Sequence, residues 1–283
     1  MITGQTRVFG LIGHPVRHSL SPAMHNELFR RRKIDGVYAA FDVAPARAGG
    51  VAAAIRTLGL SGVNLTVPFK EAVMADLDGY SSSAAVAGAV NVVVVQNGEL
   101  IGYNTDGVGY LRALKEELGA DVSGRAVAIL GAGGTARAIA AALAADGAVS
   151  VTFFNRTMAR AESACSALGG AFPGVRFQSA PLAAGAFRLY SPSFDIVVNC
   201  TSGGAVETVA GFDVRGLRAG ALWTDVNYWM PDPPQLVACA GRGVRIQRGI
   251  GMLVHQGAES FRLFTGVPVD GDTVRGVLDL GGW

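Results

Sequence analysis

Residues 126–136 read Ala-Val-Ala-Ile-Leu-Gly-Ala-Gly-Gly-Thr-Ala. The apolar run 126–130 predicts a buried strand, and the glycines after it fit the pattern Gly-x-Gly-x-x-Ala at the start of an Ala-rich helix ending near Asp146. In a dinucleotide-binding fold, the backbone N–H groups of such a turn and the helix N-terminus face a pyrophosphate. A turn without a ligand is the alternative, and the order of strand, turn and helix argues against it. The cofactor contacts predicted here are Gly131, Ala132, Gly133, Gly134, Thr135 and Ala136.

The next predicted strand ends at Phe154, where the adenosine ribose of a bound dinucleotide would lie. Enzymes that prefer NAD usually have Asp or Glu there to accept from the 2′-hydroxyl. This chain instead reads Asn-Arg-Thr-Met-Ala-Arg over 155–160, and the nearest acid downstream is Glu162. Two guanidinium groups one helical turn apart could bind a 2′-phosphate, although they could also be solvated arginines. We predict NADP(H) as the cofactor, with contacts from Asn155, Arg156, Thr157 and Arg160.

Outward from the glycine motif, short apolar runs alternate with helical stretches. In the C-terminal half, strands are predicted at 126–130, 149–154, 195–199, 222–226 and 244–247. This alternation predicts a doubly wound parallel sheet, the Rossmann fold. A helix that starts near Gly107 and ends at Gly119 leads into this domain, and a last helix is predicted from about Met252 to Thr265.

The first hundred residues predict a second α/β layer. Strands at 8–12, 37–43 and 63–67 alternate with helices at 22–32 and 47–58. Asn97-Gly98 lies between the apolar runs 91–95 and 100–103, and Asn-Gly in this setting is a strong signal for a β-hairpin. The predicted fold class is therefore α/β with two domains, of which the first sheet is partly antiparallel.

Length and composition exclude several classes of protein. The 283 residues predict about two domains, and 24 Lys+Arg against 22 Asp+Glu leave no charge excess for non-specific nucleic-acid binding. Three cysteines suit neither a disulfide framework nor a zinc site, and the four histidines lack metal-ligand spacing. No apolar run is long enough to span a membrane. We expect a cytoplasmic protein with no metal, nucleic acid or membrane as partner, either a monomer or a homodimer.

Three segments of the N-terminal half carry polar residues that packing does not explain. In residues 19–22, Ser21 and Pro22 fit the N-cap and first position of a helix, which leaves Ser19 without a role. Lys70 comes just after a predicted strand, where it could also be an ordinary surface lysine. Asp106 stands in Asn-Thr-Asp-Gly, residues 104–107, where it could serve only as a helix N-cap.

Together these segments resemble the shikimate dehydrogenase family. The matching motifs stand in family order and extend from Gly10 to Gly266, nearly the whole chain. They are Gly13-His14-Pro15, Ser19-Leu20-Ser21-Pro22-Ala23-Met24-His25-Asn26, Asn64-Leu65-Thr66-Val67-Pro68-Phe69-Lys70, Gly88-Ala89-Val90-Asn91, Asn104-Thr105-Asp106-Gly107, the glycine motif, Asn155-Arg156-Thr157 and Met252-Leu253-Val254-His255-Gln256.

The resemblance implies reversible, NADPH-dependent reduction of 3-dehydroshikimate to shikimate, on the pathway to aromatic amino acids. It implies a substrate domain of residues 1–105 joined by a C-terminal helix, 252–283, a Rossmann domain of residues 106–251, and an active site in the cleft between them. Lys70 and Asp106 would be the catalytic pair, because the alkoxide formed by hydride addition needs a proton and lysine is the available acid. The substrate contacts it implies are Ser19 and Ser21 to a carboxylate, Thr66, Asn91, Asp106 and Gln256 to ring hydroxyls, and Tyr228 nearby; further cofactor contacts are Thr201, Ser202, Gly249 and Met252.

Some positions depart from the family pattern, and they leave room for a paralogue with another ring substrate. The departures are Val92 for threonine, Pro233 for threonine, Cys200 for a smaller residue, Gly257 for alanine and Phe264 for tryptophan. A quinate/shikimate dehydrogenase commonly favours NAD and often has an acid where this chain has Thr157. A catalytically silent NADP-binding sensor would not need Lys70 and Asp106. A methylene-tetrahydrofolate dehydrogenase should lack the paired serines.

Overall fold

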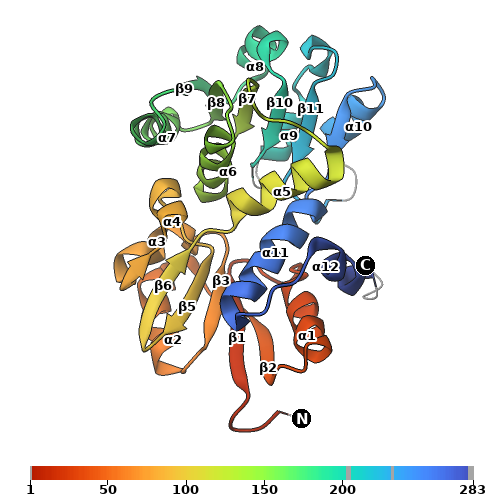
Figure 1. Ribbon diagram of the computed structural model, residues 1–283. Helices are drawn as coiled ribbons and strands as arrows, with labels where there is room; N and C mark the ends of the chain where they lie inside the picture. The colour runs from red at the N-terminus through yellow and green to blue at the C-terminus, as the bar shows by residue number, and fades with distance from the viewer. Residues whose placement is uncertain (1, 202–204, 231–232, 280–283) are drawn as a thin grey trace. The chain divides into compact units, whose positions relative to one another are not determined.

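The computed structural model describes residues 2–201, 205–230 and 233–279. It divides into two compact units, one formed by Met1–Gly109 with Val254–Trp283 and the other by Tyr110–Leu253 (Figure 1). We call them unit 1 and unit 2. Helices α5 (Asp106–Leu118) and α11 (Ile250–Thr265) each carry the chain from one unit to the other, so both divisions lie inside a helix.

Unit 2 contains a six-stranded sheet in the order β12-β11-β10-β7-β8-β9. All its neighbouring strands are parallel. The central β7 has a crossover to each side, which is the doubly wound order and confirms the predicted fold class. Its strands are β7 (Ala126–Leu130), β8 (Ser150–Asn155), β9 (Arg176–Pro181), β10 (Ile196–Asn199), β11 (Leu222–Asp225) and β12 (Arg245–Gln247).

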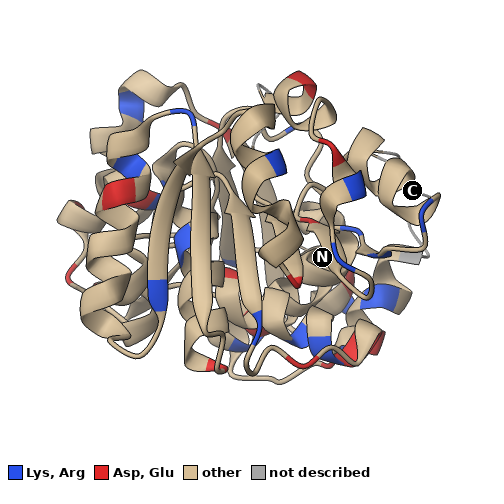
Figure 2. Cartoon of the chain, turned by 90° about the horizontal axis from the view of Figure 1, so that it is seen from above, with Lys and Arg blue, Asp and Glu red and all other residues tan. Residues whose placement is uncertain are grey.

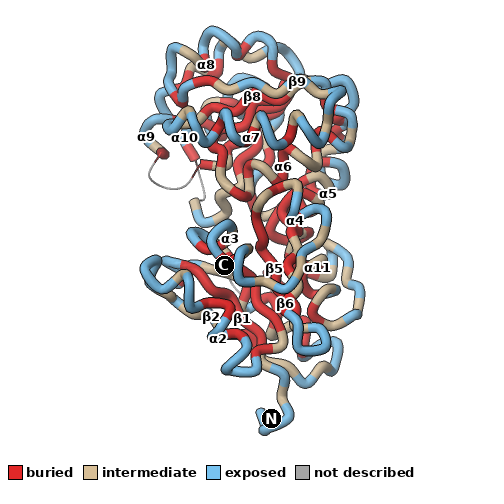
Figure 3. The backbone as a smooth tube through the Cα atoms, turned by 90° about the vertical axis from the view of Figure 1, so that its left-hand side faces the viewer, coloured by how far each residue is buried: buried red, intermediate tan, exposed pale blue. Residues whose placement is uncertain are grey.

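Helices connect these strands, and aromatic side chains fill much of the core between the layers. Phe187 stacks on Phe212 at a centroid distance of 4.7 Å and meets Trp223 edge-on at 5.8 Å. Figure 3 shows the buried segments along strand β8 and the exposed ones along the outer turns of α7 and α8. The helices are α6 (Gly134–Ala145), α7 (Met158–Ala171), α8 (Ala184–Tyr190), α9 (Val206–Ala210) and α10 (Pro234–Ala240).

Unit 1 contains a mixed sheet in the order β2-β1-β3-β5-β6-β4. Strands β1, β2 and β3 are parallel, whereas β5 is antiparallel to both β3 and β6. Asn97 and Gly98 both have positive φ, at 52° and 85°, which confirms the predicted Asn-Gly hairpin. The strands are β1 (Arg7–Gly13), β2 (Gly36–Asp42), β3 (Gly62–Leu65), β4 (Gly79–Tyr80), β5 (Val92–Gln96) and β6 (Glu99–Tyr103).

The last part of the chain returns to unit 1 and packs on its sheet. Phe264 of α11 lies 5.2 Å from Phe9 of β1 between ring centroids, and Phe261 lies 5.5 Å from Phe29 of α1. The helix predicted from about Met252 to Thr265 is confirmed as α11, which ends before Gly266, a residue with φ of 75°. The segment 252–283 also contains a second helix, α12, which the sequence analysis did not predict. The other helices of this unit are α1 (Ser21–Arg31), α2 (Val51–Thr57), α3 (Phe69–Ala72), α4 (Ser82–Ala87) and α12 (Gly271–Asp279).

Charged side chains lie mainly on helices and loops, and in the view of Figure 2 basic and acidic residues are interspersed. None of the helices in the described ranges is both long enough and apolar enough to cross a membrane. Within the same ranges, no group of three or more His, Cys, Asp or Glu side chains could hold a metal ion.

Candidate active site

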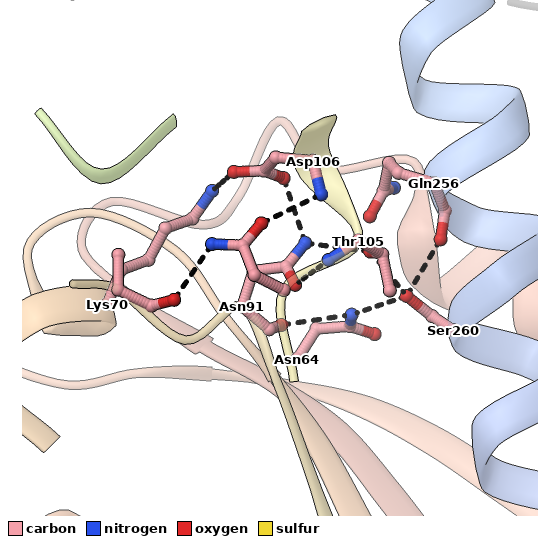
Figure 4. Close-up of polar contacts among 9 residues, drawn as sticks. Asn64, Lys70, Asn91, Thr105, Asp106, Gln256 and Ser260 are labelled. Carbon is pink, nitrogen blue, oxygen red and sulfur yellow. Dashed lines mark hydrogen bonds and ion pairs between the residues drawn. The ribbon is translucent and has the colours of Figure 1, made fainter. Parts of the chain in front are cut away.

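A buried ion pair between Lys70 and Asp106 lies at the centre of the candidate site. Lys70 is in the short helix α3 just after β3, and Asp106 is the first residue of α5. Lys70 Nζ donates to Asp106 Oδ2 at 2.5 Å, and the two side chains are only 14% and 4% exposed. Figure 4 shows the two residues reaching toward each other from different elements. The structure therefore joins an ammonium and a carboxylate that are 36 positions apart in the sequence.

Asn91 fixes the other oxygen of the Asp106 carboxylate. Its Nδ2 donates to Asp106 Oδ1 at 2.8 Å and to Thr105 Oγ1 at 2.9 Å, and its Oδ1 accepts from Thr105 N at 2.8 Å. Both amide hydrogens of Asn91 are therefore used inside the protein, and only its carbonyl oxygen keeps a lone pair for a ligand. Asn91 thus orients Asp106 whether or not it also contacts a substrate.

Asn104 caps the start of α5. Its Oδ1 accepts from Asp106 N at 3.0 Å, and its Nδ2 donates to Ala89 O at 2.8 Å. The Asp106 carboxylate instead faces Lys70 and Asn91, so reading Asp106 as nothing more than a helix N-cap is wrong.

A second layer of buried polar groups, which the sequence analysis missed, connects this site to α11. Asn64 Nδ2 donates to Ser260 Oγ at 3.1 Å and to Asn91 O at 3.2 Å, and Tyr38 OH donates to Asn64 Oδ1 at 2.7 Å. Ser260 Oγ in turn donates to Gln256 O at 2.9 Å. Figure 4 shows Gln256 and Ser260 on α11, on the opposite side of Asn91 and Thr105 from Lys70. Asn64 is part of the motif at residues 64–70, but no residue near Ser260 in the sequence marks Ser260 as the hydrogen-bond partner of Asn64.

The two serines of the N-terminal motif are linked to each other. Ser19 Oγ accepts from Ser21 N at 3.2 Å, and Ser21 is the first residue of α1. The N-cap predicted at Ser21 is therefore wrong, because Ser21 is the first residue of the helix and its own N–H group is bonded by Ser19. Thr66 lies beside β1, because a Cβ at Gly13 would overlap with Thr66 Cγ2.

In unit 2, the glycine motif forms an open turn between β7 and α6. Gly131 has φ of 102°, and a Cβ there would be 3.1 Å from Cys200 O at the end of β10. Gly133, the N-cap of α6, has no side chain with which to cap the helix, and a Cβ on it would meet none of the described atoms within 4 Å. The 12-residue helix therefore starts with a glycine at the switch point of the sheet, where a doubly wound fold binds a pyrophosphate.

The end of β8 carries basic and neutral residues only. Arg156, Thr157 and Arg160 are exposed, and Asn155 Nδ2 donates to Thr157 O at 2.8 Å. The turn holds no carboxylate that would repel a 2′-phosphate. These residues fit NADP better than NAD.

The remaining predicted cofactor contacts follow the neighbouring strands of the same sheet. Thr201 comes just after β10, where its Oγ1 donates to Asn199 Oδ1 at 2.7 Å. Gly249 lies against backbone, because a Cβ there would be 2.5 Å from Val226 O. Met252 is buried in α11, Tyr228 also belongs to unit 2, and Ser202 lies outside the described residues.

Three family models match successive parts of the chain. The shikimate dehydrogenase substrate-binding domain matches residues 11–93, the shikimate/quinate 5-dehydrogenase model matches residues 113–206, and the shikimate 5′-dehydrogenase C-terminal domain matches residues 249–278. Unit 1 thus contains the first match and most of the third, and the second match lies in unit 2.

Full-length relatives agree with these matches. The chain is 42% identical over 279 residues to the shikimate dehydrogenase (NADP(+)) of Geobacter metallireducens, covering 98% of both chains. A crystal structure of a shikimate dehydrogenase in complex with NADP+ matches with a TM-score of 0.87 at 34% identity, covering 99% of this chain and 97% of that one. The Thermus thermophilus enzyme in complex with NADP(H) and shikimate matches with a TM-score of 0.83 at 34% identity, covering 97% and 99%. With this similarity over its whole length, the chain belongs to the shikimate dehydrogenase family.

Proposed function

We propose that this enzyme catalyses the reversible, NADP-dependent interconversion of 3-dehydroshikimate and shikimate. The observation that carries the proposal is the buried Lys70–Asp106 pair, held at 2.5 Å and oriented by Asn91. Relatives of equal length named as NADP-dependent shikimate dehydrogenases support it, as does a neighbouring structure with both shikimate and NADP(H) bound. The reaction belongs to the pathway that supplies aromatic amino acids.

NADPH, when bound, supplies the hydride that reduces the ketone. Asn155, Arg156, Thr157 and Arg160 would hold its adenosine phosphate, and the open turn at 131–136 would hold its pyrophosphate. Thr201, Ser202, Gly249 and Met252 are proposed as its remaining contacts.

Proton transfer is the task of the Lys70–Asp106 pair. During reduction, the Lys70 ammonium donates a proton to the oxygen of the former carbonyl, and during oxidation the neutral amine takes it back. Asp106 holds the ammonium through Oδ2 and offers its carboxylate to a substrate hydroxyl. Asn91 and Lys70 each donate a hydrogen bond to one oxygen of the Asp106 carboxylate. The carboxylate is therefore already oriented when the substrate hydroxyl arrives.

The other proposed contacts divide between the two ends of a small polyol acid. Ser19 and Ser21 would donate to its carboxylate, whereas Thr66, Asn91 and Gln256 would bind ring hydroxyls with Asp106. Tyr228 of unit 2 is proposed as a further contact.

All three cysteines lie in the described residues and none forms a disulfide, which supports the proposed cytoplasmic location.

Initial rates of NADPH or NADH formation, followed at about 340 nm, test the proposal. Shikimate and quinate should each be offered with NADP+ and with NAD+. We expect the highest kcat/KM for shikimate with NADP+. A higher kcat/KM for quinate with NAD+ would identify a quinate dehydrogenase, and no turnover with any pair would identify a binding protein.

A further inference from the structure

Helices α5 and α11 meet through two pairs of residues within unit 1. On α5, Gly109 N donates to Thr105 O at 2.9 Å, so these residues are stacked one turn apart. On α11, Ser260 and Gln256 are stacked in the same way. Thr105 Oγ1 lies 3.4 Å from Ser260 Oγ, and Gly109 lies against Gln256. The pairs Thr105–Ser260 and Gly109–Gln256 therefore hold the two helices together in antiparallel directions.

Gly109 brings the two helix backbones close to each other. A Cβ at this position would lie 2.6 Å from both the N and Cβ atoms of Gln256 and 2.8 Å from its Cα. The N and Cα atoms belong to the helix backbone and Cβ is bonded directly to it, so none of them can rotate aside as the end of a flexible side chain can. Gly109 is buried and helical, a setting in which alanine is intrinsically the better residue, so the close approach explains why glycine stands here.

The approach at Gly109 also sets the spacing between two groups of the candidate site. Asp106 lies three residues before Gly109, in the first turn of α5, and Gln256 is the residue that Gly109 touches. Figure 4 shows Asp106 at the start of α5 and Gln256 on α11. A residue larger than glycine at position 109 therefore requires one of the two helices to shift at this contact, and such a shift changes the distance between Gln256 and Asp106.

We propose that Gly109 is a positioning residue, which places the Gln256 amide within reach of the substrate hydroxyls held by Asp106. This inference rests on the proposed function, because it takes Asp106 and Gln256 to bind the same substrate. Gly109 itself touches no substrate, and it acts only through the position of Gln256.

Gly109→Ala tests the inference by kinetics and by a double-mutant cycle with Gln256→Ala. We expect Gly109→Ala to raise KM for shikimate about threefold to tenfold, the effect of losing about one neutral hydrogen bond, while KM for NADP+ is unchanged. In the Gln256→Ala background, adding Gly109→Ala should change KM for shikimate by less than about twofold, because the residue through which it acts is already gone.

Gly257→Ala is the matched control on α11. Gly257 is the neighbour of Gln256, and its replacement by alanine gives the same gain in helix propensity as Gly109→Ala. The new Cβ, however, would lie 2.5 Å from Met24 Cε and 2.8 Å from Met24 Sδ, at the flexible end of that side chain. Its KM for shikimate should equal that of the wild type. If Gly109→Ala leaves KM for shikimate unchanged, or raises it equally with and without Gln256, the inference is overturned.

The outcomes separate this inference from the proposed function. A wild-type enzyme that does not oxidise shikimate overturns both, whereas an active wild type with a silent Gly109→Ala variant overturns only the inference. If Gln256→Ala leaves KM for shikimate unchanged, Gln256 is not a ligand and the role of Gly109 falls with it. If Gly109→Ala does not fold, Ser260→Thr replaces it in the same experiments. This variant keeps the hydroxyl group and adds one methyl group at the Thr105–Ser260 pair. The same rise in KM for shikimate is expected, and an unchanged KM would again contradict the inference.

Discussion

Lys70 Nζ donates to Asp106 Oδ2 across 2.5 Å, and neither side chain is more than 14% exposed. Lys70→Met keeps most of the apolar stem and removes the transferable proton. We expect kcat for shikimate oxidation to fall about 10²- to 10⁴-fold, the usual cost of losing a general acid and base. Because unit 2 holds the proposed NADP contacts, KM for NADP+ should change little. Steady-state kinetics with each substrate varied in turn measure both effects.

Lys115 offers a matched control for this experiment. Its Nζ also lies 2.5 Å from a carboxylate, Asp146 Oδ1, but the lysine side chain is 47% exposed. Lys115→Met should keep kcat within about twofold of wild type, since exposed ion pairs contribute little. If Lys70→Met instead keeps kcat and raises only KM for shikimate, Lys70 anchors a hydroxyl and does not transfer the proton.

Arg156 is expected to decide between the two cofactors. It is exposed just beyond β8, and its sequence neighbours Asn155 and Thr157 carry no carboxylate. Loss of a charge-assisted contact to a phosphate costs on the order of 1.5 to 3 kcal/mol, so Arg156→Ala should raise KM for NADP+ at least about tenfold and leave KM for NAD+ nearly unchanged. Arg188→Ala, at an exposed arginine of α8, should alter neither KM. An equal rise for both cofactors would contradict the assignment.

Ser19 and Ser21 should differ in their effect on stability. Because Ser19 Oγ accepts from Ser21 N at the start of α1, Ser19→Ala should lower the free energy of unfolding by about 1 kcal/mol, the usual net contribution of one hydrogen bond. Both Ser19→Ala and Ser21→Ala should raise KM for shikimate. Urea unfolding and steady-state kinetics of the two variants measure this, and a larger loss of stability in Ser21→Ala would contradict it.

His25 should make the protein less stable in acid. It is fully buried in an aromatic cluster, 4.5 Å from the ring of Tyr38, and burial lowers its pKa to about 3 from 6.5. Between these values the unfolded chain binds a proton that the folded chain excludes. The free energy of unfolding therefore falls as pH decreases, by up to about 1.4 kcal/mol per pH unit.

His25→Phe keeps an aromatic ring in this cluster and removes the proton-binding group. The free energy of unfolding of the variant should depend less steeply on pH between about pH 6 and 4 than that of the wild type. Urea unfolding across this range measures the slopes. If the slope of the His25→Phe variant equals that of the wild type, His25 is not the cause of the acid sensitivity.

Much of the fold was predictable because its strands are apolar runs bounded by turn residues. The missed strand of unit 2, β9, reads Arg-Phe-Gln-Ser-Ala-Pro and pairs only with β8 at the edge of the sheet. An edge strand needs few apolar residues, so periodicity gives little sign of it. The end of α11 was predicted at Thr265, whereas the short helix α12 after it, Gly271–Asp279, was missed.

The candidate site was predictable only where its residues stand in short motifs. Lys70, Asn91 and Asp106 each belong to such a motif, and the structure joins all three. Ser260 is 196 positions from Asn64, its hydrogen-bond partner, and in sequence it is one small residue on a helix. The capping role of Asn104 could not be assigned from the sequence, because Asn and Asp are about equally common as helix caps and both occur at the start of α5.

Unit 1 is built from both ends of the chain, and this determines the order in which a growing polypeptide can complete it. Synthesis produces β1 to β6 first. Phe261 and Phe264, which pack into the core of this sheet, and Ser260, which bonds Asn64, are made only later, with α11. Unit 2 is one continuous segment, Tyr110–Leu253, and its entire core emerges from the ribosome before that helix is finished. The half of the enzyme that carries Lys70 and Asp106 is therefore the first to be started and the last to be closed.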